Sequence, residues 1–254
     1  MPSACADAKT NSLPAAPPLG EPAVSPLAVL PRVARETVLD RVYRTLRRSL
    51  IEGAFDPGEV LRIQEVAARL AVSTMPVRDA LGRLVSERAL EALPNRSIRV
   101  PLLTRPRLDE VAHARTLVEG EAAALASRRI GVGELGELKR ETDAYDRLMT
   151  KGGSYSARAA YNHAFHFTIY RAAGSAVLLP IIESLWLQSG PFIRAAAEIY
   201  DGDDGLSATH HHRQIIAALQ AGDPEEARRA VGADVGRAFD LLRQRLPLHE
   251  ETGR

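Results

Sequence analysis

Two side chains in the run NHAFH have the types and spacing of metal ligands. Asn162 and His166 lie four residues apart. In an α-helix this spacing puts both side chains on one face, about 6 Å apart along the axis. An amide oxygen and an imidazole nitrogen can both donate to a metal ion. One helix could therefore supply half of a coordination site.

His212 and Asp234 are the other two candidate ligands. His212 opens the segment HRQIIAALQAGD, whose apolar residues predict a helix with one buried face and place the histidine at its inner rim. Asp234 lies among Val231 and Val235 on the apolar side of the last predicted helix. A carboxylate directed into a helical bundle is costly unless a positive charge meets it. A divalent cation would supply that charge.

Mixed imidazole and oxygen donors suit zinc, nickel, manganese or iron better than calcium, and we expect zinc first. The same residues allow another interpretation, in which no metal binds. A histidine on an apolar helix face is often a core or capping residue, and the triplet HHH at 210–212 could simply end a loop.

The segment after Pro101 must position these four residues, and its pattern is helical throughout. The turn-forming runs GVG, KGG, AAGS, DGDDG and AGDP divide it. The predicted helices cover about 104–130, 133–150, 154–173, 176–200, 206–221 and 223–245. Six helices with short connections and no strands predict an antiparallel bundle.

The segment before Pro101 combines short helices with β-prone pieces. An amphipathic helix is predicted over about 34–53, followed by the turn FDPGEV and by shorter helices at 63–70 and 73–87. Leu90 to Leu93 and Ile98 to Val100, separated by PNRS, predict a hairpin. The fold class is therefore mainly α, with a winged helix-turn-helix before the bundle.

The paired short helices have the dimensions of a DNA reader. Ser73, a suitable N-cap, opens the second helix, and with Thr74 it could hold phosphate at the helix N-terminus, while Arg78 could reach a guanine edge. Residues 32–100 carry thirteen arginines against nine acidic residues, which favours a polyanionic partner. The alternative is an ordinary helical hairpin whose arginines are only solvated.

The stretch LRIQEVAARLAVSTMPVRDALGRLVSERAL resembles the winged helix-turn-helix of GntR-family transcription regulators over residues 35–100. The resemblance implies DNA contacts from Gln64, Ser73, Thr74 and Arg78 and from the wing residues Asn95 and Arg96. Arg88 and Ser97 stand where the family commonly has glycine. We expect the fold to survive this difference and the contacts of the wing to change.

The second half resembles the all-helical FCD domain of the FadR-like branch of that family. Asn162, the pair Phe165-His166, the turn AAG at 172–174 and the segment that begins at His212 match its order. The resemblance implies a metal held by Asn162, His166, His212 and Asp234, with Asn162 in place of Asp and Asp234 in place of His.

The resemblance also implies an effector. In such domains the metal binds the carboxylate of a small organic acid, and an arginine at the position of Arg115 balances its charge. Trp186 and Arg194 are further candidates for the wall of the effector pocket. For Trp186, plain core packing is the slightly favoured alternative.

These inferences predict a ligand-responsive regulator rather than an enzyme. The proline and alanine content of residues 1–31 predicts a disordered leader. We expect a DNA-binding domain at 32–100 and a domain for ligand binding and dimerisation at 101–247. A homodimer would bind operator DNA. The single cysteine, Cys5, fits a reducing cytoplasm, and no apolar run is long enough to span a membrane.

Two alternatives from other classes stay open. A metal-dependent hydrolase could use the same ligands, with Glu183 or His163 as its general base. A DNA-binding regulator could also bind an apolar ligand in its second domain without any metal.

Overall fold

The computed structural model describes residues 36–94, 97–199 and 206–245. The predicted leader and the predicted wing contacts Asn95 and Arg96 lie outside these ranges. Within them the protein is mainly helical with one small antiparallel sheet, which confirms the predicted fold class. No helix in the same ranges is long and apolar enough to cross a lipid bilayer.

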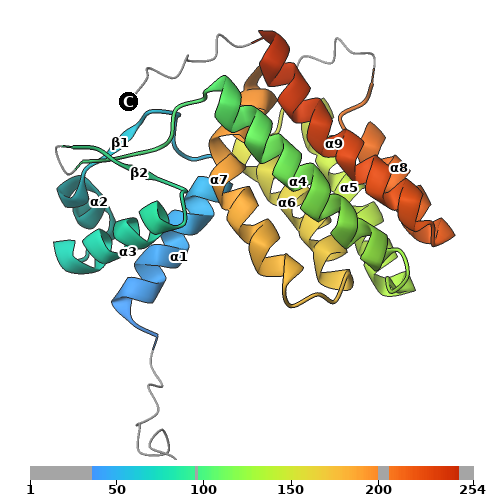
Figure 1. Ribbon diagram of the computed structural model, residues 1–254, viewed down its shortest axis with the longest axis horizontal. Helices are drawn as coiled ribbons and strands as arrows, with labels where there is room; N and C mark the ends of the chain where they lie inside the picture. The colour runs from blue at the N-terminus through green and yellow to red at the C-terminus, as the bar shows by residue number, and fades with distance from the viewer. Residues whose placement is uncertain (1–35, 95–96, 200–205, 246–254) are drawn as a thin grey trace, which may run out of the picture. The chain divides into compact units, whose positions relative to one another are not determined.

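The first elements form the predicted helix-turn-helix and its sheet (Figure 1). They are α1 (Val38–Ile51), β1 (Val60–Leu61), α2 (Ile63–Leu70), α3 (Thr74–Ser86), β2 (Glu91–Ala92) and β3 (Ile98–Arg99). Helix α1 begins later than predicted because Thr37 and Asp40 cap each other's backbone N–H groups there. Ala71, in the left-handed conformation, ends α2, and Ser73 is the N-cap of α3.

The sheet has one more strand than the predicted hairpin. Its order is β1-β3-β2, with Val60 and Glu91 both paired with Arg99 from opposite sides. Strand β1 begins at Val60, the last residue of the FDPGEV run, and its two residues are too few to show an alternating pattern. Arg88, where the family commonly has glycine, adopts φ +58°, the left-handed region that glycine enters most easily.

The core of this first part follows from the spacing of apolar residues on α3. Val77, Ala80, Leu81 and Leu84 recur at three- and four-residue intervals and are completely buried. They pack with Leu46 and Leu50 of α1 in one hydrophobic cluster. The opposite face of α3 stays open to solvent.

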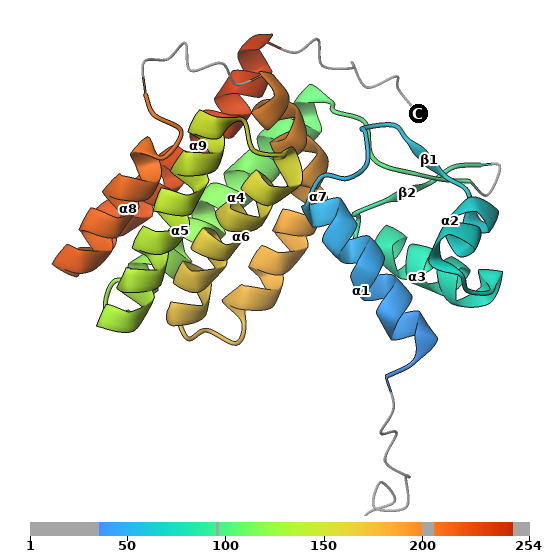
Figure 2. The ribbon, with the colours of Figure 1, turned by 180° about the vertical axis from the view of Figure 1, so that it is seen from behind.

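Six further helices make up the bundle. They are α4 (Arg105–Ala126), α5 (Val132–Lys151), α6 (Tyr155–Ala172), α7 (Leu178–Ile199), α8 (His210–Ala221) and α9 (Pro224–Arg245). Their bounds differ from the predicted ones by a few residues. Helices α4 and α9 lie side by side in Figure 1, and α5 and α6 are neighbours in Figure 2. The bundle encloses a large apolar core around Phe165, Trp186 and Phe239.

Helices α1 and α7 meet at Gly190, which is buried. A Cβ at this position would overlap the carbonyl oxygen of Leu50 and approach the Cα of Ile51 at 3.4 Å. Nearby, Leu187 of α7 is buried in the hydrophobic cluster of α1 and α3. The contact between the two helices therefore depends on the absence of a side chain at Gly190.

Replacing Gly190 tests this contact. We expect Gly190→Ala to lower the free energy of unfolding by about 1–3 kcal/mol, because α1 and α7 must separate to admit the methyl group. Urea denaturation measures the change. Gly82→Ala is the control, since nothing lies within 4 Å of a Cβ there. This variant should be neutral or slightly stabilised. Equal stability of both variants would contradict the close contact.

Candidate metal centre and DNA-reading helix

Three of the four predicted metal ligands converge on one point. His166 comes from α6, His212 from the start of α8 and Asp234 from the middle of α9. Their donor atoms all lie within 4.8 Å of one another. His166 Nε2 is 3.2 Å from Asp234 Oδ2, and His212 Nε2 is 4.0 Å from Asp234 Oδ1. Asn162, one helical turn before His166, lines the same cavity.

The geometry fits a first-row divalent ion. Donors bound at about 2.0–2.2 Å to a tetrahedral ion lie about 3.3–3.6 Å apart. The 3.2 Å between His166 Nε2 and Asp234 Oδ2 is close to this distance, and the 4.0 Å between His212 Nε2 and Asp234 Oδ1 would have to shorten by about 0.4–0.7 Å. Two imidazoles and a carboxylate, with a nearby amide, are also the donor types that such ions select. The residues present could hold the metal.

The hydrogen bonds around His166 determine which of its nitrogens faces the site. Tyr170 donates its hydroxyl proton to the Glu119 carboxylate, so its oxygen accepts from His166 Nδ1 at 3.1 Å. We assign the Nδ1 proton on this basis. Nε2 then faces Asp234 with a lone pair or a second proton. Because a lone pair would repel the carboxylate, this arrangement calls for a positive charge between them, either a proton or a metal ion.

Burial and the neighbouring His166 together determine the charge of His212 and Asp234. Desolvation lowers the pKa of His212 to about 4, against the opposing effect of Asp234, so this imidazole is neutral at pH 7 and can donate a lone pair. Burial also disfavours ionisation of Asp234, but the hydrogen bond and charge of His166 outweigh it and hold the pKa of this carboxyl well below its usual range. At neutral pH the site thus offers a carboxylate and at least one neutral imidazole.

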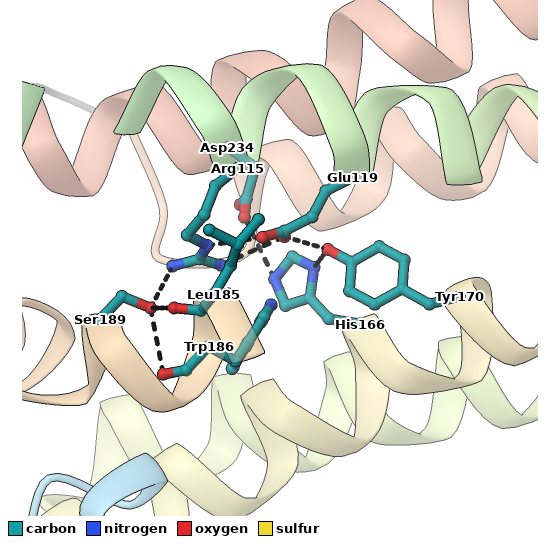
Figure 3. A network of polar contacts seen from close by, with 8 residues as sticks. All are labelled: Arg115, Glu119, His166, Tyr170, Leu185, Trp186, Ser189 and Asp234. Atoms are coloured by element: carbon teal, nitrogen blue, oxygen red, sulfur yellow. Dashed lines mark hydrogen bonds and ion pairs between the residues drawn. The ribbon is translucent and has the colours of Figure 1, made fainter. Parts of the chain in front are cut away.

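Arg115 reaches the same cavity from α4 and is held there by buried partners. Its Nε lies 2.5 Å from Glu119 Oε1 and its Nη2 lies 3.1 Å from Glu119 Oε2, while Nη1 donates to Ser189 Oγ at 3.3 Å. Figure 3 shows how Glu119 joins Arg115 to Tyr170 and so to His166. Only 4% of Arg115 and none of Glu119 is exposed. The guanidinium is therefore fixed in one position beside the candidate metal site.

The structure does not place Trp186 and Arg194 in the pocket wall. Neither is among the residues that line the cavity. The Trp186 ring is buried 4.5 Å below the Arg115 guanidinium, so it packs behind the site. Arg194 donates to the carbonyl oxygen of Gly53 and pairs with Asp56, which draws its guanidinium toward the end of α1. The sequence pattern of α7 alone could not predict these partners of Arg194, because they lie far away in the chain.

The cavity beside the ligands has a volume of about 140 Å³, enough for a small organic molecule. Every helix of the bundle contributes to its wall. Residues not predicted from the sequence include Tyr145 and Met149 of α5, Arg158 of α6 and Arg237 of α9. The sequence could have indicated Arg158 as a cavity residue, since it precedes Asn162 by four residues and so lies on the same helix face.

The two candidate general bases of a hydrolase are engaged elsewhere. His163 stacks on Phe167 and contacts the edge of Trp186. Glu183 accepts a hydrogen bond from Arg47 at 3.1 Å. Neither residue lines the cavity with the candidate metal ligands. Neither of the two candidates is therefore placed in this cavity to act as a general base.

Four of the predicted DNA-reading residues are open to solvent. Gln64, Ser73, Thr74 and Arg78 are all exposed, on α2 and around the N-terminus of α3. Ser73 is the N-cap by backbone position, but its hydroxyl does not accept the capping hydrogen bond. Within the described part of the chain, Arg78 has no ion pair. These groups are therefore accessible to a phosphate backbone and to base edges.

A winged helix-turn-helix followed by a helical bundle with an internal cavity is the architecture of a DNA-binding transcription regulator. Comparison with family models gives the same class. Residues 39–100 match the bacterial regulatory proteins of the gntR family, and residues 110–237 match the FCD domain. The chain belongs to the GntR family of transcription regulators, in the group with an FCD domain. The families and the relatives it matches are regulators, not enzymes.

Individual relatives agree with this assignment. The chain is 29% identical to the HTH-type transcriptional regulator McbR of Escherichia coli, over 80% of this chain and 92% of McbR. It is 31% identical to a probable D-xylose utilization operon transcriptional repressor of Paenarthrobacter nicotinovorans, over 79% and 86% of the two chains. The solved structure of E. coli McbR/YncC superposes with a TM-score of 0.75 at 28% identity, covering 83% of this chain and 99% of that one.

Proposed function

We propose that this regulator senses a small organic acid through a divalent metal ion, with zinc the first choice, and adjusts its operator binding in response. The proposed ligands are Asn162, His166, His212 and Asp234. The observation that supports the proposal most strongly is the convergence of two histidines and an aspartate in a cavity that Arg115 also enters. The protein would act in the cytoplasm as a homodimer, one unit for each half of a palindromic operator.

The bound metal would supply a positive centre for the carboxylate of the acid. The protein's own residues do the rest of the work at this site. Tyr170 orients the His166 ring, and Glu119 keeps the Arg115 guanidinium in place for a second contact with the carboxylate. His166, His212 and Arg115 are buried at this cavity, and burial strengthens the charge interactions of these side chains.

Contacts between the cavity wall and α1 could transmit the signal. Tyr155 lines the cavity and packs closely against Gly53, just after α1. A Cβ placed at Gly53 would lie only 2.9 Å from the Tyr155 hydroxyl oxygen. Arg194, next to the cavity residue Ile193, donates to the Gly53 carbonyl at 2.9 Å. An acid that binds one arrangement of α6 and α7 more tightly would thus bias the position of the DNA-binding helices.

Metal analysis and acid binding together test the proposal. The full-length protein is purified, its metal content is measured, and its thermal unfolding is recorded with a panel of sugar acids, hydroxy acids and dicarboxylates. We expect at least one acid to raise the melting temperature and to change operator affinity, and a chelator to abolish both effects. A shift that survives complete metal removal would favour the alternative of a regulator without a metal.

The DNA-reading surface has a separate test. We expect Arg78→Ala to weaken specific operator binding by about 1–3 kcal/mol, because one bidentate arginine contact with guanine contributes that amount. Fluorescence anisotropy with labelled operator at fixed salt measures the change. Arg69→Ala, which removes an exposed arginine from α2 outside the predicted contact set, is the control. Equal losses in both variants would indicate only a nonspecific effect of charge.

A further inference from the structure

Arg158 is a cation in the cavity wall whose charge no carboxylate balances in the described part of the chain. Its Nη1 contacts only the Met149 sulfur, a weak acceptor, at 3.4 Å. Its Nε is buried without a hydrogen-bond partner. The side chain is half-buried, so solvent reaches it only partly. A guanidinium in this state is costly unless something in the cavity accepts its hydrogen bonds.

The other charges around the cavity leave room for more than one negative charge. Glu119 balances Arg115 with two hydrogen bonds. Asp234 can balance one of the two charges of a divalent ion. The remaining charge of the ion and the charge of Arg158 then have no protein counterpart among these groups. A bound ligand with two negative charges would neutralise both.

The position of Arg158 separates the two charges in space. Arg158, Asn162 and His166 follow one another at four-residue intervals, so they share one face of α6. The helix rise puts the backbone of Arg158 about 6 Å from that of Asn162 and about 12 Å from that of His166. All three side chains lean toward the N-terminus, so this spacing along the helix is kept at their ends. A ligand that reaches both places needs its anionic groups at opposite ends of a carbon chain.

We propose that the effector is a dianion, in the sense of a molecule with two separate anionic groups, and that it bridges the metal site and Arg158. One carboxylate binds the metal and Arg115, and a second anionic group, a carboxylate or a phosphate, accepts hydrogen bonds from Arg158. The planar guanidinium suits either group, because both accept two parallel N–H bonds. This inference rests on the proposed function, since it assumes an acid held at the metal.

Matched pairs of acids test the second anionic position. Calorimetry with the zinc-loaded full-length protein compares succinate with butyrate, glutarate with valerate, and phosphoglycolate with glycolate. For at least one pair we expect the dianion to bind about tenfold or more tightly than its partner, as for a charge-assisted hydrogen bond. The first two pairs represent a second carboxylate, and the third represents a phosphate.

Variants identify the residue responsible. Arg158→Gln should remove the preference for the dianion, with a much smaller loss of affinity for the monoanion. Arg158→Lys keeps the positive charge but lacks the two parallel N–H donors of the guanidinium, so this variant should retain part of the preference for the dianion. Arg171→Gln is the control, because Arg171 lies on the same helix but is exposed and donates to Thr168. Circular dichroism and the unfolding midpoint of each variant verify that the fold is retained.

The possible failures are distinct. If no acid of either kind binds the zinc-loaded protein, the proposed function itself is wrong. If acids bind but each dianion matches its monoanionic partner, the second anionic position is wrong and the metal site stands. If Arg158→Gln weakens the binding of both members of a pair equally, the second anionic position is likewise wrong.

Discussion

His166→Ala is expected to lower the affinity of the protein for Zn²⁺ by about a hundredfold or more. A four-ligand zinc site contributes roughly 10–16 kcal/mol of apparent binding free energy, so one ligand accounts for roughly 2.5–4 kcal/mol. The imidazole is buried and points its Nε2 at Asp234, so no solvent-exposed group can readily replace it. Competition with a chromophoric chelator at constant pH gives the affinity.

The adjacent histidines provide a matched control. His211 precedes the proposed ligand His212, and its Nδ1 is 3.0 Å from Oε1 of Gln214 on α8. We expect His211→Ala to retain the zinc affinity of the unmodified protein, whereas Asp234→Ala should lose it as His166→Ala does. Similar zinc affinities in His166→Ala and His211→Ala would show that His166 is a core histidine and not a ligand.

Glu119→Ala is expected to lower the free energy of unfolding by about 3–5 kcal/mol. The change leaves the Arg115 guanidinium buried without its counterion, and removal of one partner from a buried ion pair has costs of this size. Tyr170 also loses the acceptor of its hydroxyl proton. The effect should be measured by urea denaturation in the presence of chelator, so that metal binding does not contribute.

A neighbouring acid separates this effect from general loss of charge. Glu121, two residues along α4, pairs with Arg228 at 2.7 Å on the surface. We expect Glu121→Ala to change stability little, because exposed ion pairs are screened by water and salt. All proteins should be compared at one protomer concentration, since self-association would make stability concentration-dependent. If Glu119→Ala is as stable as Glu121→Ala, the buried network is not stabilising the bundle.

The sequence predicted the helices well because each is long enough to repeat an apolar pattern several times. The hydrophobic face of α3, from Val77 to Leu84, is an example. Strand β1 was missed because two residues cannot establish a period, and its pairing with β3 joins segments far apart in the chain. Helix ends shifted by a few residues where local caps such as Thr37 decide them.

The candidate site was predictable only in part. His166, His212 and Asp234 could be selected because polar residues among apolar ones on a helix are unusual, and the structure brings these three together. Their roles as ligands stay a prediction. Glu119 and Tyr170 could not be selected, because their importance depends on contacts across three helices. The contacts of Arg194 could not be predicted for the same reason, since its partners Gly53 and Asp56 lie more than a hundred residues away.

The close approach at Gly190 limits how this protein can be recombined with its relatives. A chimera that joins this DNA-binding half to the bundle of another family member inherits that protein's residue at the equivalent point of α7. Any side chain there would push against the backbone at Leu50 and reposition the transplanted half. Functional hybrids should therefore be sought among partners with glycine at this junction, or by exchanging α1 and α7 as a single unit.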